Sequence, residues 1–176
     1  MRALLLAYAV CALAARAACA RDDPNFPCAG CQLSVGVGGT YDYFDKTGGI
    51  VAPFAFDFGH GRWELAAFRF TTAQYLEPRG ASPARRFTNP YWGASLSYRF
   101  GLWTRPSMRV FLGLGTAWKS ETDRLNSTQW NFAEQLGVRW RLSNAWALEL
   151  TVRHWSNAGL KLPNRGQDFA TLTLVF

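Results

Sequence analysis

Residues 146–156 read WALELTVRHWS, and this stretch shows the fold most plainly. Apolar side chains occupy the even positions from 146 to 152, and Glu149, Thr151 and Arg153 stand at odd positions between them. Successive side chains of a β-strand point to opposite faces, so this alternation gives one apolar face and one polar face. Such a strand separates an apolar surrounding from a polar interior, as in membrane barrels.

The same alternation recurs along the chain in runs of about ten residues, which is typical of transmembrane β-barrels. The sequence therefore predicts an all-β fold, an eight-stranded antiparallel transmembrane β-barrel over residues 32–176. The third run changes phase midway, which predicts a β-bulge near Ala66 and Ala67. The eight runs cover residues 33–43, 50–58, 62–72, 92–100, 108–118, 130–140, 146–153 and the segment that ends at Phe176.

A soluble eight-stranded barrel of the lipocalin type also alternates. Such a barrel would line its interior with apolar residues to hold an apolar ligand, whereas the polar face of this chain carries charges. Charged side chains can pair inside a barrel whose apolar face meets lipid, so the pattern favours the membrane barrel. The predicted interior residues are Asp57, Arg99, Arg109, Gln135, Arg139, Glu149 and Arg153.

The N-terminus has the pattern of an export signal. Arg2 precedes an apolar stretch, and Ala18-Cys19-Ala20 fits a small-residue cleavage site, so residues 1–20 are predicted to be a signal peptide. A lipoprotein with acylated Cys19 is the weaker alternative, because Arg16 stands where an aliphatic residue is expected. The remaining chain suits a single domain.

Residues 21–31 are predicted to form a periplasmic segment that contains Cys28 and Cys31. In an oxidising compartment a local disulfide is the plain expectation for this pair. A redox site would need a helix N-terminus to activate a thiol, and the preceding Asp-Pro-Asn-Phe-Pro does not begin a helix. A zinc site would need more ligands than the neighbouring sequence offers.

The charge and the links between runs indicate partners and orientation. Without Arg2 and Arg16, 17 basic residues face 12 acidic ones, which favours anionic lipid surfaces over nucleic acid. Outer-membrane barrels have short periplasmic turns and long outer loops, so the seventh run is expected to point outward. The predicted short links are 59–61, 101–107 and 143–144, and the long ones are 72–89 and 119–127.

Three polar side chains near the C-terminus have the composition of a hydrolytic site. His154, Ser156 and Asp168 share the even parity of the lipid-facing residues of their strands, which places them on the outer wall. Polar groups on a lipid-facing wall are costly, and a membrane lipid as substrate would explain them. We predict Ser156 as nucleophile, His154 as general base and Asp168 as the acid that orients it.

Other residues extend this predicted site. The Asn164 side chain and the backbone N–H groups of Asn157 and Gly159 are candidate oxyanion donors. Glu134 has the same outward parity on the neighbouring strand and is the alternative acid or a supporting residue. A His-x-Ser pair is by itself a weak signal, because polar residues often end strands. Cations expected to hold lipid phosphates are Lys161, Arg165, Arg85 and Arg86, together with Arg79, Lys119 and Arg124.

Residues 154–166, HWSNAGLKLPNRG, resemble the signature of the outer-membrane lipid A 3-O-deacylases, the PagL family. The resemblance implies an eight-stranded barrel whose Ser-His-Glu site faces the outer leaflet and removes the ester-linked 3-position acyl chain of lipid A. It also implies no metal or other cofactor. The family's base, nucleophile and oxyanion side chain match His154, Ser156 and Asn164. The family acid falls on Asp168, where the family usually has the longer Glu.

This resemblance predicts a lipid A 3-O-deacylase, a serine esterase embedded in the outer membrane of a Gram-negative cell, with lipopolysaccharide as partner. One alternative is a non-catalytic small outer-membrane barrel for adhesion or membrane integrity. Another is a palmitoyltransferase-like barrel, although the charged interior speaks against an internal acyl slot. The sequence leaves a homodimer open, and also whether Asp168 or Glu134 is the acid.

Overall fold

The computed structural model describes residues 31–42, 47–70, 73–74, 86–87, 91–122, 126–164 and 166–176. The predicted signal peptide and Cys28 therefore lie outside the described residues. Cys31 forms a disulfide bond. No helix in the described part of the chain is both long and apolar enough to cross a membrane.

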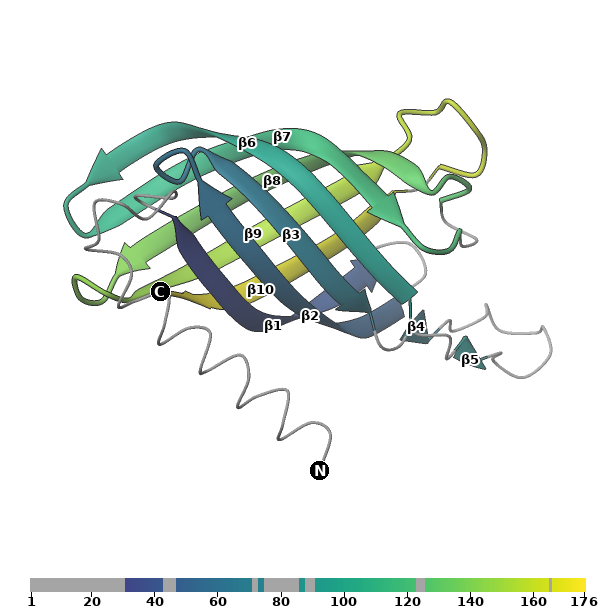
Figure 1. The fold of residues 1–176 in the computed structure, drawn as a ribbon. Coiled ribbons are helices and arrows are strands. Elements are labelled where there is room, and N and C mark those ends of the chain that lie inside the picture. The colour runs from purple at the N-terminus through teal and green to yellow at the C-terminus, as the bar shows by residue number, and fades with distance from the viewer. Residues whose placement is uncertain are drawn as a thin grey trace.

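Eight strands of the described chain form a closed antiparallel barrel in the order β1-β10-β9-β8-β7-β6-β3-β2 (Figure 1). The predicted fold is confirmed. Closure leaves no unpaired strand edge, which a chain in lipid requires. The short strands β4 (Ala73–Gln74) and β5 (Arg86–Phe87) pair separately. The barrel strands are β1 (Gln32–Asp42), β2 (Thr47–Phe58), β3 (Trp63–Phe70), β6 (Tyr91–Arg105), β7 (Met108–Lys119), β8 (Trp130–Arg141), β9 (Ala147–Ser156) and β10 (Gln167–Val175).

Strand β3 has no bulge, so the predicted irregularity at Ala66 and Ala67 is wrong. The strand pairs without a register shift with β2 on one side and β6 on the other. The apparent phase change has another cause: Phe68 and Phe70 point into the barrel and are buried there. The register shift lies instead in β6, between Gly101 and Trp103.

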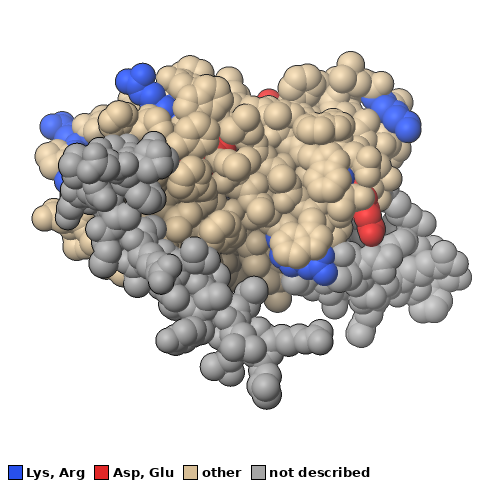
Figure 2. Space-filling view, viewed as in Figure 1, with Lys and Arg blue, Asp and Glu red and all other residues tan. Residues whose placement is uncertain are grey.

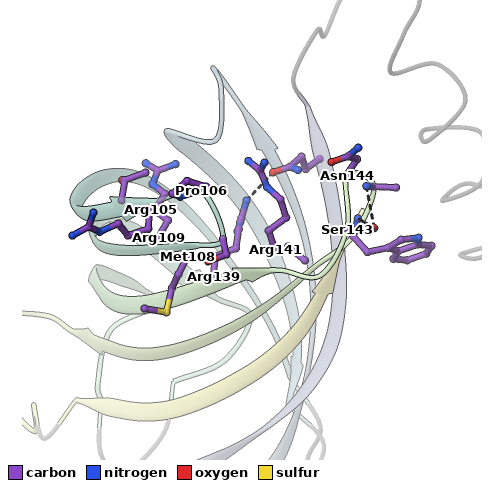
Figure 3. A pocket seen from close by; sticks show the side chains of 14 residues that line it. Arg105, Pro106, Met108, Arg109, Arg139, Arg141, Ser143 and Asn144 are labelled. Atoms are coloured by element: carbon purple, nitrogen blue, oxygen red, sulfur yellow. Dashed lines mark hydrogen bonds between the residues drawn. The ribbon is translucent and has the colours of Figure 1, made fainter.

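The connections at one end of the barrel are short. The β2–β3 turn covers residues 59–62, and the β8–β9 turn covers residues 142–146. The predicted link 101–107 is too long, because β6 continues to Arg105 and leaves only residues 106–107 as a turn. Two of these turns flank the mouth of the barrel in Figure 3. The C-terminus lies at this end, which is the periplasmic end in outer-membrane barrels.

The outer wall is apolar. Alternate residues of every barrel strand expose aliphatic or aromatic side chains, for example Leu65 at 51% and Val152 at 55%. Figure 2 shows that most of the visible wall between the two ends is free of charged side chains. An exposed apolar surface of this extent is stable only against lipid, so the barrel spans a membrane.

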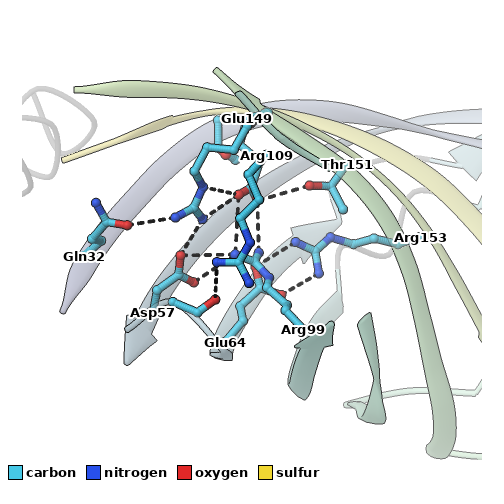
Figure 4. A network of polar contacts seen from close by, with 11 residues as sticks. Gln32, Asp57, Glu64, Arg99, Arg109, Glu149, Thr151 and Arg153 are labelled. Carbon is cyan, nitrogen blue, oxygen red and sulfur yellow. Dashed lines mark hydrogen bonds and ion pairs between the residues drawn. The ribbon is translucent and has the colours of Figure 1, made fainter. Parts of the chain in front are cut away.

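A network of buried charges, here called the charge network, fills the periplasmic half of the interior (Figure 4). Arg99 donates to the carboxylates of Asp57 and Glu149 and also contacts Glu64. The prediction that charges pair inside the barrel is confirmed for every predicted interior charge except Arg109. Glu64 also belongs to the network and was not predicted, although its place between Trp63 and Leu65 gives it the inward phase. The network comprises Asp57, Glu64 and Glu149 with Arg99, Arg139 and Arg153.

Aromatic rings fill the other half of the interior. Trp155 meets Phe68, Phe70 and Phe169 edge to face, with ring centroids 5.1–5.7 Å apart. Edge-to-face contacts of this kind hold rings in defined orientations. Together with Tyr91, which stacks on Phe70, these rings form the aromatic cluster. Trp155 and Phe169 project inward from β9 and β10, so the cluster fixes the two strands that carry the predicted site.

Replacement of Arg99 by methionine is expected to destabilise the barrel strongly. Arg99 is 2% exposed, and its removal leaves the carboxylates of Asp57, Glu64 and Glu149 with only two arginines. Removal of one partner of a buried ion pair lowers the free energy of unfolding by about 3–5 kcal/mol. Urea unfolding in detergent micelles, followed by tryptophan fluorescence, measures this loss. Arg62→Met in an exposed turn is the matched control, and an equal loss in both variants would contradict the expectation.

Candidate active site

His154 and Asp168 form the centre of the site. They are direct cross-strand partners in the β9–β10 ladder. Asp168 Oδ1 lies 2.7 Å from His154 Nδ1. An ionised carboxylate can only accept, so we assign the proton to Nδ1, which donates a hydrogen bond to Asp168. The side chains are 38% and 51% exposed on the outer wall, which agrees with the predicted outward parity. The shorter aspartate reaches the ring because the register sets the two residues opposite each other.

Ser156 follows His154 on the same face of β9, two residues closer to the strand end. It is partly exposed and lies opposite Phe132 of β8. In the described part of the chain its hydroxyl makes no hydrogen bond to the His154 ring, although catalytic hydrogen bonds are often long before a substrate binds. Because Asp168 occupies Nδ1, the Nε2 atom of His154 is the one free to act on Ser156 or on a substrate.

Glu134 lies on the other side of the histidine. It is the cross-strand partner of His154 in the β8–β9 ladder and is exposed on the same wall. Two acids thus flank the imidazole, one on each neighbouring strand. Asp168 is the one that makes a hydrogen bond to His154 among the described residues.

Gly166 packs directly against the imidazole. A Cβ atom on this residue would lie 2.3 Å from His154 Cε1 and 2.9 Å from Nε2, closer than any real contact. The residue also has φ of 74°, a conformation that favours glycine. The turn before β10 therefore presses on the ring and limits the positions that His154 can take.

Residues 157–164 and 166, here called the site loop, are organised by Asn157. Its backbone N–H donates to Asn164 Oδ1 (3.0 Å), and its side-chain amide donates to the Lys161 carbonyl oxygen (2.7 Å). The Gly159 N–H donates to Asn157 Oδ1 (3.0 Å). The two backbone donors predicted for an oxyanion are thus used inside the loop. The Asn164 amide accepts through Oδ1, which leaves its Nδ2 group to donate elsewhere.

A neighbouring segment holds the site loop in place, a contact that the sequence did not predict. Asn126 is fully buried and forms a β-bridge with Asn164. The Ser127 N–H donates to the Pro163 carbonyl oxygen (3.1 Å), and the Ser127 hydroxyl donates to the Lys161 carbonyl oxygen (3.1 Å). Asn126 stands in a long polar link without periodicity, so no sequence pattern marks it.

The predicted phosphate-binding cations have different outcomes. Lys161 is exposed on the site loop. The prediction that Lys119 lies at the outer rim is wrong, because Lys119 is fully buried at the end of β7, 6.0 Å from the Tyr91 ring. Its odd position gives the inward phase of β7. Arg86 belongs to β5, and its side chain lies outside the described residues, as do Arg79, Arg85, Arg124 and Arg165.

The site offers a hydroxyl, an imidazole bonded to a carboxylate and an amide donor on a lipid-facing wall. These are the components of acyl transfer through a serine nucleophile. The described residues contain no group of three or more His, Cys, Asp or Glu side chains that could hold a metal ion.

Comparison with known proteins gives consistent matches. The family model described as Lipid A 3-O-deacylase (PagL) matches residues 52–176. Lipid A deacylase PagL of Bordetella bronchiseptica is 31% identical over 88 residues, 48% of this chain and 49% of that protein. The match thus spans about half the length of this curated relative.

Two solved structures resemble the barrel. The crystal structure of the outer membrane enzyme PagL has a TM-score of 0.48 and 20% identity, and the match covers 81% of this chain and 98% of that chain. The crystal structure of Neisserial surface protein A has a TM-score of 0.46 and 14% identity, over 82% and 92% of the two chains. The chain is an outer-membrane barrel, and because the family model covers well over half of it, it belongs to the lipid A 3-O-deacylase (PagL) family.

Proposed function

We propose that this protein is a lipid A 3-O-deacylase, a serine esterase that hydrolyses the ester-linked 3-position acyl chain of lipid A in the outer leaflet. Membership of the family supports this proposal. The observation that carries it is the 2.7 Å contact between His154 and Asp168, with Ser156 on the same lipid-facing wall. Ordinary outer-membrane barrels have no reason to expose an oriented imidazole beside a hydroxyl toward lipid.

In the proposed reaction Ser156 Oγ attacks the ester carbonyl carbon while His154 Nε2 takes the hydroxyl proton. Asp168 holds Nδ1 protonated and stabilises the imidazolium that forms. The tetrahedral intermediate collapses when His154 returns the proton to the departing sugar oxygen. Water, activated by the same imidazole, then hydrolyses the acyl-enzyme and releases a fatty acid.

The oxyanion needs a donor beside Ser156. We assign this role to the Asn164 side chain, because its Oδ1 is held by the Asn157 N–H and its orientation is therefore fixed. A preorganised donor of this kind stabilises charge that develops in the transition state. Asn157 and Gly159 support it by organising the loop, rather than by donating to the oxyanion themselves.

The outer wall supplies the acyl-chain environment in this proposal. Phe132 is the cross-strand neighbour of Ser156 and is 51% exposed. Leu160 and Leu162 on the site loop are each 80% exposed on either side of Lys161. Apolar groups with a cation between them match a lipid that joins acyl chains to phosphates. The substrate would reach Ser156 from within the leaflet, without passing through water.

The interior argues against a barrel that holds an acyl donor inside. Such a barrel needs an empty apolar interior, whereas the described interior contains the charge network in one half and the aromatic cluster in the other. The external position of His154 and Ser156 favours hydrolysis at the lipid-facing wall.

Incubation of the purified protein with lipopolysaccharide in detergent tests the function. Mass spectrometry of the lipid A should show the loss of one hydroxyacyl group and the release of the corresponding fatty acid. Unchanged lipid A would reject the esterase in favour of a non-catalytic barrel. A gain of acyl mass would identify an acyltransferase instead.

Replacement of Gly166 by alanine is expected to reduce deacylation at least about 100-fold, because displacement of a catalytic group by 1 Å costs this much. The new methyl group would overlap the His154 ring, and φ of 74° would strain the backbone. The initial rate of fatty-acid release measures the effect. Gly159→Ala is the matched control, because its φ is 79° and a Cβ there meets no atom within 4 Å. Equal losses in the two variants would mean that backbone strain, and not the ring, is responsible.

A homodimer stays a prediction within this proposal. Light scattering coupled to size-exclusion chromatography measures the mass of the protein in detergent and so tests for the dimer. Because His154, Ser156 and Asp168 all come from β9 and β10 of one chain, the proposed chemistry does not require a second copy. Activity at a protein concentration where only monomer is present is therefore expected.

A further inference from the structure

The periplasmic mouth of the barrel contains a cavity that the proposed function does not use. It has a volume of about 330 Å³ and lies between the β6–β7 turn and the β8–β9 turn. Four arginines line it, and no aspartate or glutamate does: Arg105, Arg109, Arg139 and Arg141. Figure 3 shows their side chains gathered around the mouth, at the opposite end of the barrel from the site loop.

One of these arginines is already neutralised. Arg139 donates to Glu149 (2.6 Å) and to Gln32 (2.8 Å), and it also contacts Asp57. It belongs to the charge network, in which three arginines balance three carboxylates. Arg139 therefore forms the inner wall of the cavity, and its charge is not available to a ligand.

The other three arginines form no ion pair with a described acid, and Arg109 has only the longer-range attraction of Asp57 and Glu149. Arg109 donates to the Gly61 carbonyl oxygen at 3.4 Å, and Arg105 lies over the Trp103 ring at 5.7 Å. Arg141 is exposed. Within the ranges that the structure describes, none of the three lies within ion-pair distance of a carboxylate. Three like charges around one small cavity repel each other, and an anion between them would remove that repulsion.

The rim beside this cavity is apolar. Trp103 is 42% exposed, Trp146 43% and Leu142 62%, and Trp146 also lines the cavity. Tryptophans at the end of a barrel wall mark the level of the lipid headgroups. The cations thus lie at headgroup depth beside a surface that accepts acyl chains.

We propose that this cavity binds the phosphate of an anionic phospholipid from the inner leaflet. Arginine guanidinium groups are well suited to phosphate, because they present several donors in a fixed plane. The phosphate lies among Arg105, Arg109 and Arg141, and the acyl chains run along Trp146 and the neighbouring wall. Free phosphate offers the same anionic oxygens as the lipid phosphate, but it has no acyl chains to contact the apolar rim.

Native mass spectrometry of the mature protein in detergent tests this site with phosphatidylglycerol, phosphatidylethanolamine and inorganic phosphate. Phosphatidylglycerol should bind best, because its headgroup has a net negative charge. The combined variant Arg105→Gln, Arg109→Gln and Arg141→Gln should bind it at least about tenfold more weakly, since each lost charge-assisted hydrogen bond weakens binding. Arg62→Gln removes a cation of the same periplasmic end that does not line the cavity, and should bind normally.

Three outcomes would overturn the proposal. One is unchanged phosphatidylglycerol binding by the triple variant, and another is an equal loss in Arg62→Gln. The third is arginine-dependent binding of inorganic phosphate without binding of the lipid, which would assign the cavity to a soluble anion. The shift of the folded barrel on unheated gels shows that each variant is folded, and fatty-acid release should stay unchanged because the cavity is remote from His154.

Discussion

Replacement of Ser156 by alanine is expected to reduce fatty-acid release by at least about 1,000-fold while the barrel stays folded, because removal of a serine nucleophile leaves only binding and oxyanion stabilisation. Ser156 is partly exposed on the outer wall, and among the described residues its hydroxyl makes no hydrogen bond to the His154 ring. Loss of this hydroxyl therefore removes the nucleophile without leaving a buried polar group unsatisfied, so the fold should stay stable.

The measurement is the initial rate of hydroxyacyl loss from lipid A, with equal amounts of folded barrel. His154→Asn should give a loss of the same size, and the double variant should be no worse than either single one, because nucleophile and base act as a unit. Ser127→Ala is the matched control: it removes a hydroxyl that contacts the site loop through the Lys161 carbonyl oxygen. Substantial release by Ser156→Ala would reject the proposed nucleophile.

The second large effect is expected at the acid. Asp168→Asn should reduce the rate about 10²–10⁴-fold, because an amide cannot hold the histidine in the right tautomer or stabilise its charged form. In the native protein the Asp168 carboxylate accepts a 2.7 Å hydrogen bond from His154 Nδ1. An amide would offer either its oxygen, without the charge, or a competing donor.

Glu134→Gln is the comparison that distinguishes the two acids. Glu134 faces His154 from β8 but makes no hydrogen bond to it within the described residues, so a loss of less than about tenfold is expected. If Glu134→Gln abolishes activity and Asp168→Asn does not, the assignment of the acid is wrong. Asp168→Glu should keep more activity than Asp168→Asn, because it retains the charge.

The alternation of side chains was enough to predict the barrel. A strand has a period of two, and a wall between lipid and a polar interior forces that period on the sequence, as in β9 with Leu148, Leu150 and Val152 outside and Glu149 and Arg153 inside. The same rule predicted the outward position of His154, Ser156 and Asp168.

The pattern failed where apolar side chains point inward. Phe68 and Phe70 fill the interior. The prediction assumed that every apolar residue faces lipid, so their inward phase was explained by a bulge. Lys119 failed for a related reason: a cation near a loop was expected at the rim, although its phase in β7 points it inside. One-dimensional patterns do not distinguish lipid from an aromatic cluster, since both are apolar.

The sequence by itself determined the barrel, the face on which each site residue lies and the match to a family signature, because these depend on local periodicity and on residue identity. Only the tertiary structure decided that Asp168 reaches His154, that Gly166 presses on the ring and that Asn126 holds the site loop. Those contacts depend on the register between strands and on loops far apart in the sequence, and no periodic signal specifies either of them.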